Sequence, residues 1–119
     1  MSPRSPNRWR TRRPQPAILF AGLFAALGDA TRLDLVGKLS SGQPTSIAQL
    51  TTGSQLTRQA IAKHLSVLRR AGIVHSTREG REQLFTLDPG PMHEMRQYLD
   101  RVSHQWDLAL ARLKSFVEE

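Results

Sequence analysis

The side chains with the clearest chemical potential lie close together near the middle of the chain. Arg58 can donate two hydrogen bonds to guanine, and Gln59 can pair with adenine, at the edges that bases present in the major groove of duplex DNA. Lys63 adds a third polar group, while Thr57 and Ala62 suit contacts to a phosphate or to a thymine methyl group. We therefore expect these residues to contact DNA, with Arg58, Gln59 and Lys63 leading in the groove.

A helix must position these side chains, and the sequence around them has the spacing of one. The apolar residues fall on a single helical stripe, and the polar groups fall off it. The stripe consists of Leu56, Ile61, Leu65 and Leu68. Thr57 is a good N-cap, flanked by an apolar pair suited to a hydrophobic staple, and Arg58 follows in the first turn, where the helix dipole disfavours a cation unless an anion is near. Taken alone, the segment fits an ordinary amphipathic helix with a solvated basic face equally well.

The length and charge of the chain narrow the possible partners. The chain has 119 residues and a formal net charge of +7, which predicts one domain with a modest core. Basic residues gather in residues 1–16 and again in residues 53–81, whereas the chain from residue 88 is mildly acidic. This uneven charge favours a polyanionic partner, nucleic acid ahead of a membrane surface. The absence of cysteine excludes disulfides, thiolate metal sites and thiol redox sensing.

The N-terminal region raises the question of targeting. Two arginines precede an apolar run at residues 17–27, which could pass for a signal sequence. The run is shorter than the roughly 20 residues of a membrane span, and Pro14 and Pro16 interrupt its junction with the arginines. Because a small domain needs this run for its core, we expect a cytoplasmic protein without a membrane partner. Residues 1–15 lack apolar periodicity and are expected to form a disordered basic tail.

Two helices are predicted before the DNA-contacting segment. The first begins at Pro16, runs to about Leu27 and is apolar nearly all round, so another chain should cover it. The residues expected in that contact are Phe20, Leu23 and Phe24. Asp29 is a good N-cap for the second helix, which should run from Ala30 to about Leu39. The inner stripe of this second helix is predicted to consist of Leu33, Val36 and Leu39.

A helix-turn-helix is predicted over about residues 46–72. Its first helix opens with a capping box, in which Ser46 is followed by Gln49 three positions later. A short turn joins this helix to the basic, well-capped one that follows Thr57, and Gly72 ends the pair. His64 lies on the inward margin of the second helix, so we expect a packed structural histidine rather than a base contact.

A β-hairpin is predicted over about residues 73–87. Two β-rich runs flank Gly80, which can adopt the positive φ that a tight hairpin needs. Arg78 and Arg81 then lie near the tip. We expect them to contact phosphates or the minor groove, as the tip of a two-stranded wing would.

The last predicted helix, from about residue 92 to 117, carries a long apolar seam. Apolar residues recur alternately three and four positions apart over about three heptads. The seam residues expected in a subunit interface are Met95, Leu99, Val102, Trp106, Leu113 and Phe116. A domain of this size has little surface left to bury such a seam, so we expect it to pair with another subunit. The alternative is that the helix packs on the core of its own chain.

The order of these elements resembles the ArsR/SmtB type of bacterial winged-helix repressor. The resemblance rests on FAALGDATRLDLVGKLSSG and TRQAIAKHLSVLRRAGIVHSTREGREQLFTLD, above all on the Asp-Ala-Thr-Arg opening at residues 29–32 and on His64, Leu65, Leu68 and Arg69. It covers about residues 20–116. The resemblance implies a mainly α (α+β) fold, a winged helix-turn-helix with a two-stranded β wing and a long C-terminal dimerisation helix. It also implies a homodimer that binds operator DNA and usually represses.

Two departures from the family pattern concern the helix-turn-helix. The segment at residues 43–47 holds no cysteine pair, where relatives often carry one for metal or metalloid sensing. That sensing site is therefore absent. The turn between Leu50 and Thr57 is also longer than the family's usual one by about three residues, so the resemblance does not set the entry angle of the DNA-contacting helix.

A third departure concerns the zinc site that some relatives form between their terminal helices. His93, His104 and Asp107 fall at the matching spacing, but Pro91 stands where the first aspartate should be. Eleven residues of helix rise about 16 Å, so His93 and His104 could share a metal only through an antiparallel partner helix. With one ligand missing, we expect no metal site and no other cofactor. The alternative is an inter-subunit site in which the three remaining side chains and a water hold zinc.

These features favour a sequence-specific double-stranded DNA-binding transcriptional regulator that acts as a homodimeric repressor. The sequence has no glycine-rich phosphate loop, no cysteine nucleophile, and no serine, histidine and carboxylate set at a recognisable spacing, so an enzyme is not expected. The alternative is a winged-helix protein–protein interaction module without operator specificity. No residue pattern identifies a small-molecule or metal effector.

Overall fold

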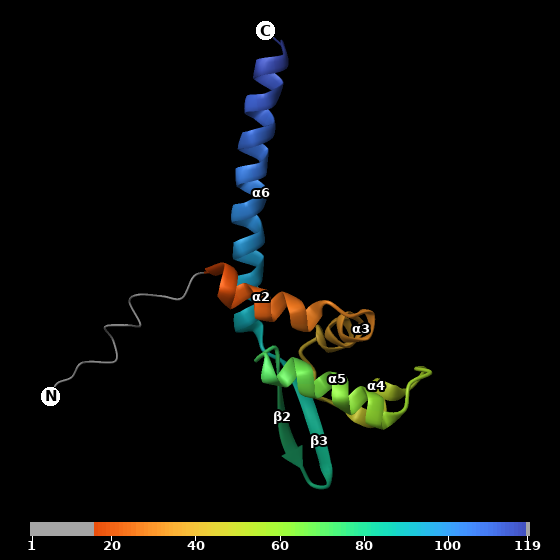
Figure 1. Ribbon diagram of the computed structural model, residues 1–119. Helices are drawn as coiled ribbons and strands as arrows, with labels where there is room; N and C mark the ends of the chain where they lie inside the picture. The colour runs from red at the N-terminus through yellow and green to blue at the C-terminus, as the bar shows by residue number, and fades with distance from the viewer. Residues whose placement is uncertain (1–15, 119) are drawn as a thin grey trace, which may run out of the picture. The chain divides into compact units, whose positions relative to one another are not determined.

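The computed structural model describes residues 16–118, except for the side chains of Pro16, Ala17 and Leu19 (Figure 1). The predicted tail at residues 1–15 lies outside the described residues. The elements in chain order are α2 (Pro16–Leu27), α3 (Ala30–Leu39), β1 (Thr45–Ser46), α4 (Ile47–Thr51), α5 (Arg58–Arg70), β2 (Val74–Glu79), β3 (Glu82–Leu87) and α6 (Pro89–Glu118). The chain divides into two compact units, the first ending at Leu87 and the second beginning at Asp88. Within residues 16–118, no helix has both the length and the apolar character needed to cross a bilayer.

The helices of the first unit begin where their capping residues predict. The Asp29 carboxylate accepts a hydrogen bond from the backbone N–H of Arg32 at 3.0 Å, which fixes the start of α3. At the start of α4, Ser46 and Gln49 form the predicted capping box. The buried apolar residues of this unit are Phe20, Leu23, Ala26, Leu35, Val36, Leu39, Leu50, Ile61, Leu65, Leu68, Ile73, Val74 and Phe85.

The predicted inner stripe of α3 was wrong at one position. Leu33 is 55% exposed, whereas Leu35 is 1% exposed and belongs to the core with Val36 and Leu39. The helix packs against α2, α5 and β3 at once, so its buried face is centred one residue away from the stripe that a simple three-residue spacing suggests. The shift turns Leu33 out of the core.

The wing is a regular hairpin with a third strand beside it. Strands β2 and β3 pair antiparallel from Val74↔Leu87 to Glu79↔Glu82, which leaves Gly80 and Arg81 as the turn. Gly80 has φ 63°, a value that glycine adopts without strain and that suits the first position of a type II′ turn. Strand β1 pairs with β3, so the sheet order is β1-β3-β2. Figure 1 shows the β2–β3 hairpin projecting beyond α5.

The second unit is the helix α6, which is longer than predicted. It begins at Pro89, whereas the sequence suggested that the prolines break the chain before about residue 92. Asp88 accepts a hydrogen bond from the backbone N–H of Gly90 at 2.8 Å. Pro89 and Pro91 occupy the first turn, where a backbone N–H has no partner within the helix, so the two prolines help to start α6.

Candidate nucleic-acid interface

The start of α5 is set by its capping residue. Thr57 has extended backbone angles, and its hydroxyl accepts a hydrogen bond from the backbone N–H of Ala60 at 3.1 Å. From there Ile61, Leu65 and Leu68 point into the core. This arrangement confirms the predicted N-cap and fixes which side of α5 faces outward.

The end of α5 is closed by a Schellman motif. Gly72 has φ 83° and donates its backbone N–H to the carbonyl of Arg69 at 2.9 Å, and Ile73 donates to the carbonyl of Leu68 at 3.0 Å. The side chains of Ile73 and Leu68 are both 0% exposed. This buried pair determines the direction in which the chain leaves α5 and enters β2.

The outward face of α5 carries the polar groups that the sequence singled out. Thr57, Arg58, Gln59 and Lys63 are exposed, and Ala62 is half-buried. Within residues 16–118, no hydrogen bond or ion pair engages the side chains of Arg58, Gln59 or Lys63. The first turn of α5 also holds no acidic residue, so the partial positive charge of the helix N-terminus is left uncompensated. This face is therefore suited to an external anion with hydrogen-bonding groups.

The wing places Arg78 and its carboxylates on opposite faces. Arg78 pairs across the hairpin with Gln83, and Glu79 pairs with Glu82. Because successive strand residues point to opposite faces, Arg78 lies on one face of the hairpin and the two glutamates lie on the other. Arg81 is exposed in the turn itself. The face that carries Arg78 is the one suited to a phosphate backbone.

A hydrogen-bonded link that sequence reasoning missed joins this wing face to α5. Arg69, in the last turn of α5, donates to the Ser76 hydroxyl at 3.1 Å, and the Gln83 amide donates to the same oxygen at 3.1 Å. No local pattern in the sequence marks Arg69, Ser76 or Gln83 as part of a link. They lie on different elements, and only the fold brings them together.

A second link joins α5 to the junction between α2 and α3. The Nδ1 atom of His64 lies 3.4 Å from Arg32 Nη1 and 3.7 Å from Asp29 Oδ2, and the His64 side chain is 25% exposed. His64 is therefore the structural histidine that its inward position predicted. The backbone N–H of Arg32 lowers the pKa of the Asp29 carboxyl below its usual value, and the nearby Arg32 guanidinium acts in the same direction.

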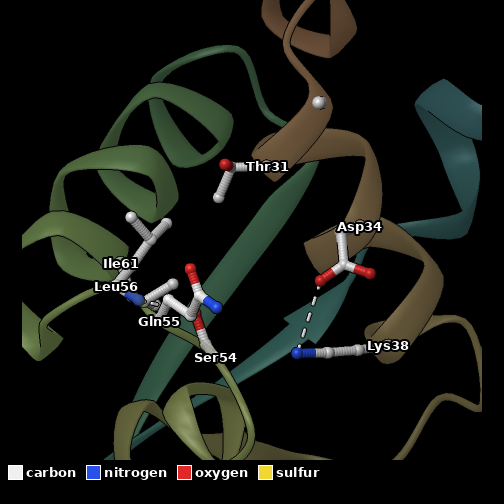
Figure 2. Close-up of a pocket in the computed structure, with 8 residues that line it drawn as sticks. Thr31, Asp34, Lys38, Ser54, Gln55, Leu56 and Ile61 are labelled. Atoms are coloured by element: carbon white, nitrogen blue, oxygen red, sulfur yellow. Dashed lines mark hydrogen bonds and ion pairs between the residues drawn. The ribbon is translucent and has the colours of Figure 1, made fainter.

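The leading end of α5 borders a surface hollow of about 380 Å³ (Figure 2). Figure 2 shows Leu56, Ile61 and Gln55 on one side of the hollow and the ion pair of Asp34 with Lys38 on the other, at 3.3 Å. Lys38 Nζ also donates to the Leu50 carbonyl at 3.3 Å, which ties α3 to the end of α4. The second contact holds the end of α4, after which the turn leads into α5.

The three side chains at the spacing of the family's zinc ligands do not form a cluster within one chain. His93, His104 and Asp107 are exposed on α6. Over residues 16–118, no three histidine or acidic side chains come together in a group that could hold a metal ion. In the segment 43–47, none of the residues is a cysteine or a histidine.

The fold defines a class: this is a winged helix-turn-helix protein. The helix-turn-helix domain family matches residues 27–77. The chain is 38% identical over 79 residues to the uncharacterised HTH-type transcriptional regulator YuzN of Bacillus subtilis (61% of this chain, 86% of YuzN). It is 31% identical over 95 residues to the HTH-type transcriptional regulator Rv2034 of Mycobacterium tuberculosis (80% of this chain, 85% of Rv2034).

The fold also matches that of a solved structure. The ArsR-like transcriptional regulator from Rhodococcus sp. RHA1 superimposes with a TM-score of 0.69 at 35% identity, over 83% of this chain and 92% of that one. The chain belongs to the ArsR family of winged helix-turn-helix transcriptional regulators. It is a DNA-binding regulator and not an enzyme.

Proposed function

We propose that this regulator is a homodimer that binds an operator sequence and represses transcription from it. The observation that carries the proposal is the outward face of α5, where Arg58, Gln59 and Lys63 are exposed and have no partner among the described residues. Arginine and glutamine at the leading end of an inserted helix can contact base edges directly. Thr57 and Ala62 would add phosphate and methyl contacts beside them.

The apolar seam of α6 supports a second copy of the chain as the partner. Trp106 is 63% exposed, Leu113 is 58% exposed and Phe116 is 77% exposed in the single chain. They recur with Leu99 and Val102 at the three-and-four spacing of a helix pair, and an identical helix offers a matching seam. Burial of these side chains would drive dimerisation.

Helix α2 would contribute less to the interface than its sequence suggests. Phe20 and Leu23 are already buried in the single chain, whereas Ile18 is 71% exposed and Phe24 is half-buried. We therefore propose that Ile18 and Phe24 provide most of the α2 contact, with Phe20 and Leu23 supporting them from beneath. Met95 is likewise buried in the single chain, so it would lie beneath the side chains that form the subunit interface and would not contact the partner directly.

A dimer would present two α5 helices to one face of the duplex. In this arrangement the helices occupy successive major grooves about 34 Å apart. Arg78 and Arg81 of each wing would then contact the adjacent phosphates or minor groove. Bound across a promoter, such a dimer would repress by excluding the polymerase. The absence of cysteine makes this repression independent of a thiolate metal site.

Selection of duplexes from a random pool tests the proposal. The affinity of the selected duplex should exceed that of a scrambled duplex by about 10³-fold or more, and both should fall steeply with salt. Equal affinity for the two duplexes, together with tight retention of a protein partner, would favour the interaction module instead. The same selected duplex, placed over a promoter in a reporter assay, distinguishes repression from activation.

A further inference from the structure

Arg32 uses its whole guanidinium group to join three helices. Its Nε donates to the Ala26 carbonyl and its Nη2 donates to the Ala25 carbonyl at 3.4 Å, both in the last turn of α2. Its third nitrogen, Nη1, lies 3.4 Å from His64 Nδ1 on α5. Arg32 itself lies in the first turn of α3, where its backbone N–H is held by Asp29.

We propose that Arg32 is a positioning residue for DNA recognition. Through its contact with His64, Arg32 sets the orientation of α5. The inference rests on the proposed function and adds a group that does not itself touch DNA. The Ala26 carbonyl has no backbone partner among the described residues, and the Ala25 carbonyl accepts from the backbone N–H of Gly28 at 3.1 Å in addition to Arg32, so a cation with several donors is favoured at this end of α2. A guanidinium can satisfy them and still donate to α5, which the compact ammonium of lysine cannot do.

The link matters because apolar contacts fix which side of α5 faces the core but oppose a small rotation about the helix axis less sharply than a directional hydrogen bond does. Ile61, Leu65 and Leu68 bury one side of α5, but such packing is not directional. A rotation of about 10° moves groups at the helix surface, about 5–6 Å from the axis, by about 1 Å. A shift of that size is enough to break a hydrogen bond between a side chain and a base edge. The bond to His64, in the middle of α5, opposes this rotation.

The chemistry of His64 gives a matched pair of variants. For Arg32 to donate to Nδ1, that nitrogen must be the acceptor, with the proton on Nε2. His64→Asn places an amide oxygen near the position of Nδ1 and keeps an acceptor for Arg32. His64→Leu is apolar and removes the acceptor. Both variants leave the bonds between Arg32 and α2 in place.

The experiment compares specific and non-specific affinity for the full-length protein. Wild type, Arg32→Gln, Arg32→Lys, His64→Leu, His64→Asn and the double variant Arg32→Gln/His64→Leu are titrated against the selected and the scrambled duplex. All measurements are made well below each variant's unfolding midpoint. Lys114→Ala serves as the control for loss of one cation, since Lys114 is exposed on α6 away from the seam.

Arg32→Gln, Arg32→Lys and His64→Leu should each lower affinity for the selected duplex by about ten-fold to a hundred-fold. Affinity for the scrambled duplex should change no more than in Lys114→Ala. His64→Asn should stay within about three-fold of wild type, and the double variant should lose no more than the worse single one, because both changes break one link.

Three results would overturn the inference: equal losses for both duplexes, additive losses in the double variant, or a His64→Asn protein as weak as His64→Leu. If Arg32→Gln fails to fold, the two His64 variants decide the question, because they leave the contacts to α2 intact. A wild-type protein without duplex preference would overturn the proposed function itself, which is a separate and recognisable result.

Discussion

Arg58→Ala should change DNA binding and protein stability in opposite directions. Arg58 is exposed in the first turn of α5 and has no partner among the described residues, so its removal breaks no contact within residues 16–118. Loss of a bidentate contact to guanine should cost about 1–3 kcal/mol of binding free energy, or about 5-fold to 150-fold in affinity. Removal of a cation from a helix N-terminus should raise the free energy of unfolding by about 0.3–1 kcal/mol.

Two assays test this pair of effects. Fluorescence anisotropy with the selected duplex and its single-base variants should show the affinity loss together with relaxed preference at one base pair. Urea denaturation at low salt should show the gain in stability. Lys114→Ala, which removes an exposed cation from α6, should leave base preference unchanged. If Arg58→Ala weakens all duplexes equally, or lowers the free energy of unfolding, the assignment of Arg58 to the DNA-contacting end of α5 is wrong.

The other predictions concern the wing, the seam and the start of α3. Arg81→Ala should weaken binding to all sequences alike and flatten the slope of log affinity against log salt by about one unit; a change in base preference would contradict a phosphate contact. Trp106→Glu places a carboxylate in the seam and should weaken dimerisation by about 2 kcal/mol or more in sedimentation experiments, while Lys114→Glu should not. Asp29→Asn keeps a good N-cap but removes the charge, so it isolates the effect of ionisation. The pKa of Asp29 is held below 3.8 in the folded protein, so wild type should be the more stable protein at neutral pH. The difference should shrink as the pH falls below about 3.8, and a constant difference would refute the electrostatic interpretation.

The helices of this fold could be predicted because their ends are encoded locally. Asp29, Ser46 and Thr57 are each followed by a backbone N–H that their side chains bind, and Gly72 supplies the positive φ that ends α5. A strand as short as β1 has no comparable signal. Its two residues pair with β3 across about forty positions of sequence, and no periodicity extends over so few residues.

The candidate site shows the same division between local and distant effects. The exposed face of α5 follows from its own apolar spacing, so the exposure of Arg58, Gln59 and Lys63 could be predicted in advance. The groups that orient this helix could not be predicted from the sequence. Arg32 meets His64 across 32 positions of sequence, and no local pattern encodes such a contact. The sequence placed His64 on the inward margin of its helix, and both residues belong to the segments that most resemble the family, but neither observation identifies Arg32 as the partner of His64.

A hydroxyl-radical footprint of the selected operator is the most direct test of the central claim. A pair of subunits that places one α5 helix in each of two successive grooves should protect two patches on one face of the duplex, centred about 10–10.5 base pairs apart, with two chains bound per duplex. A single protected patch with one chain per duplex, or uniform protection along the whole DNA, would contradict the account.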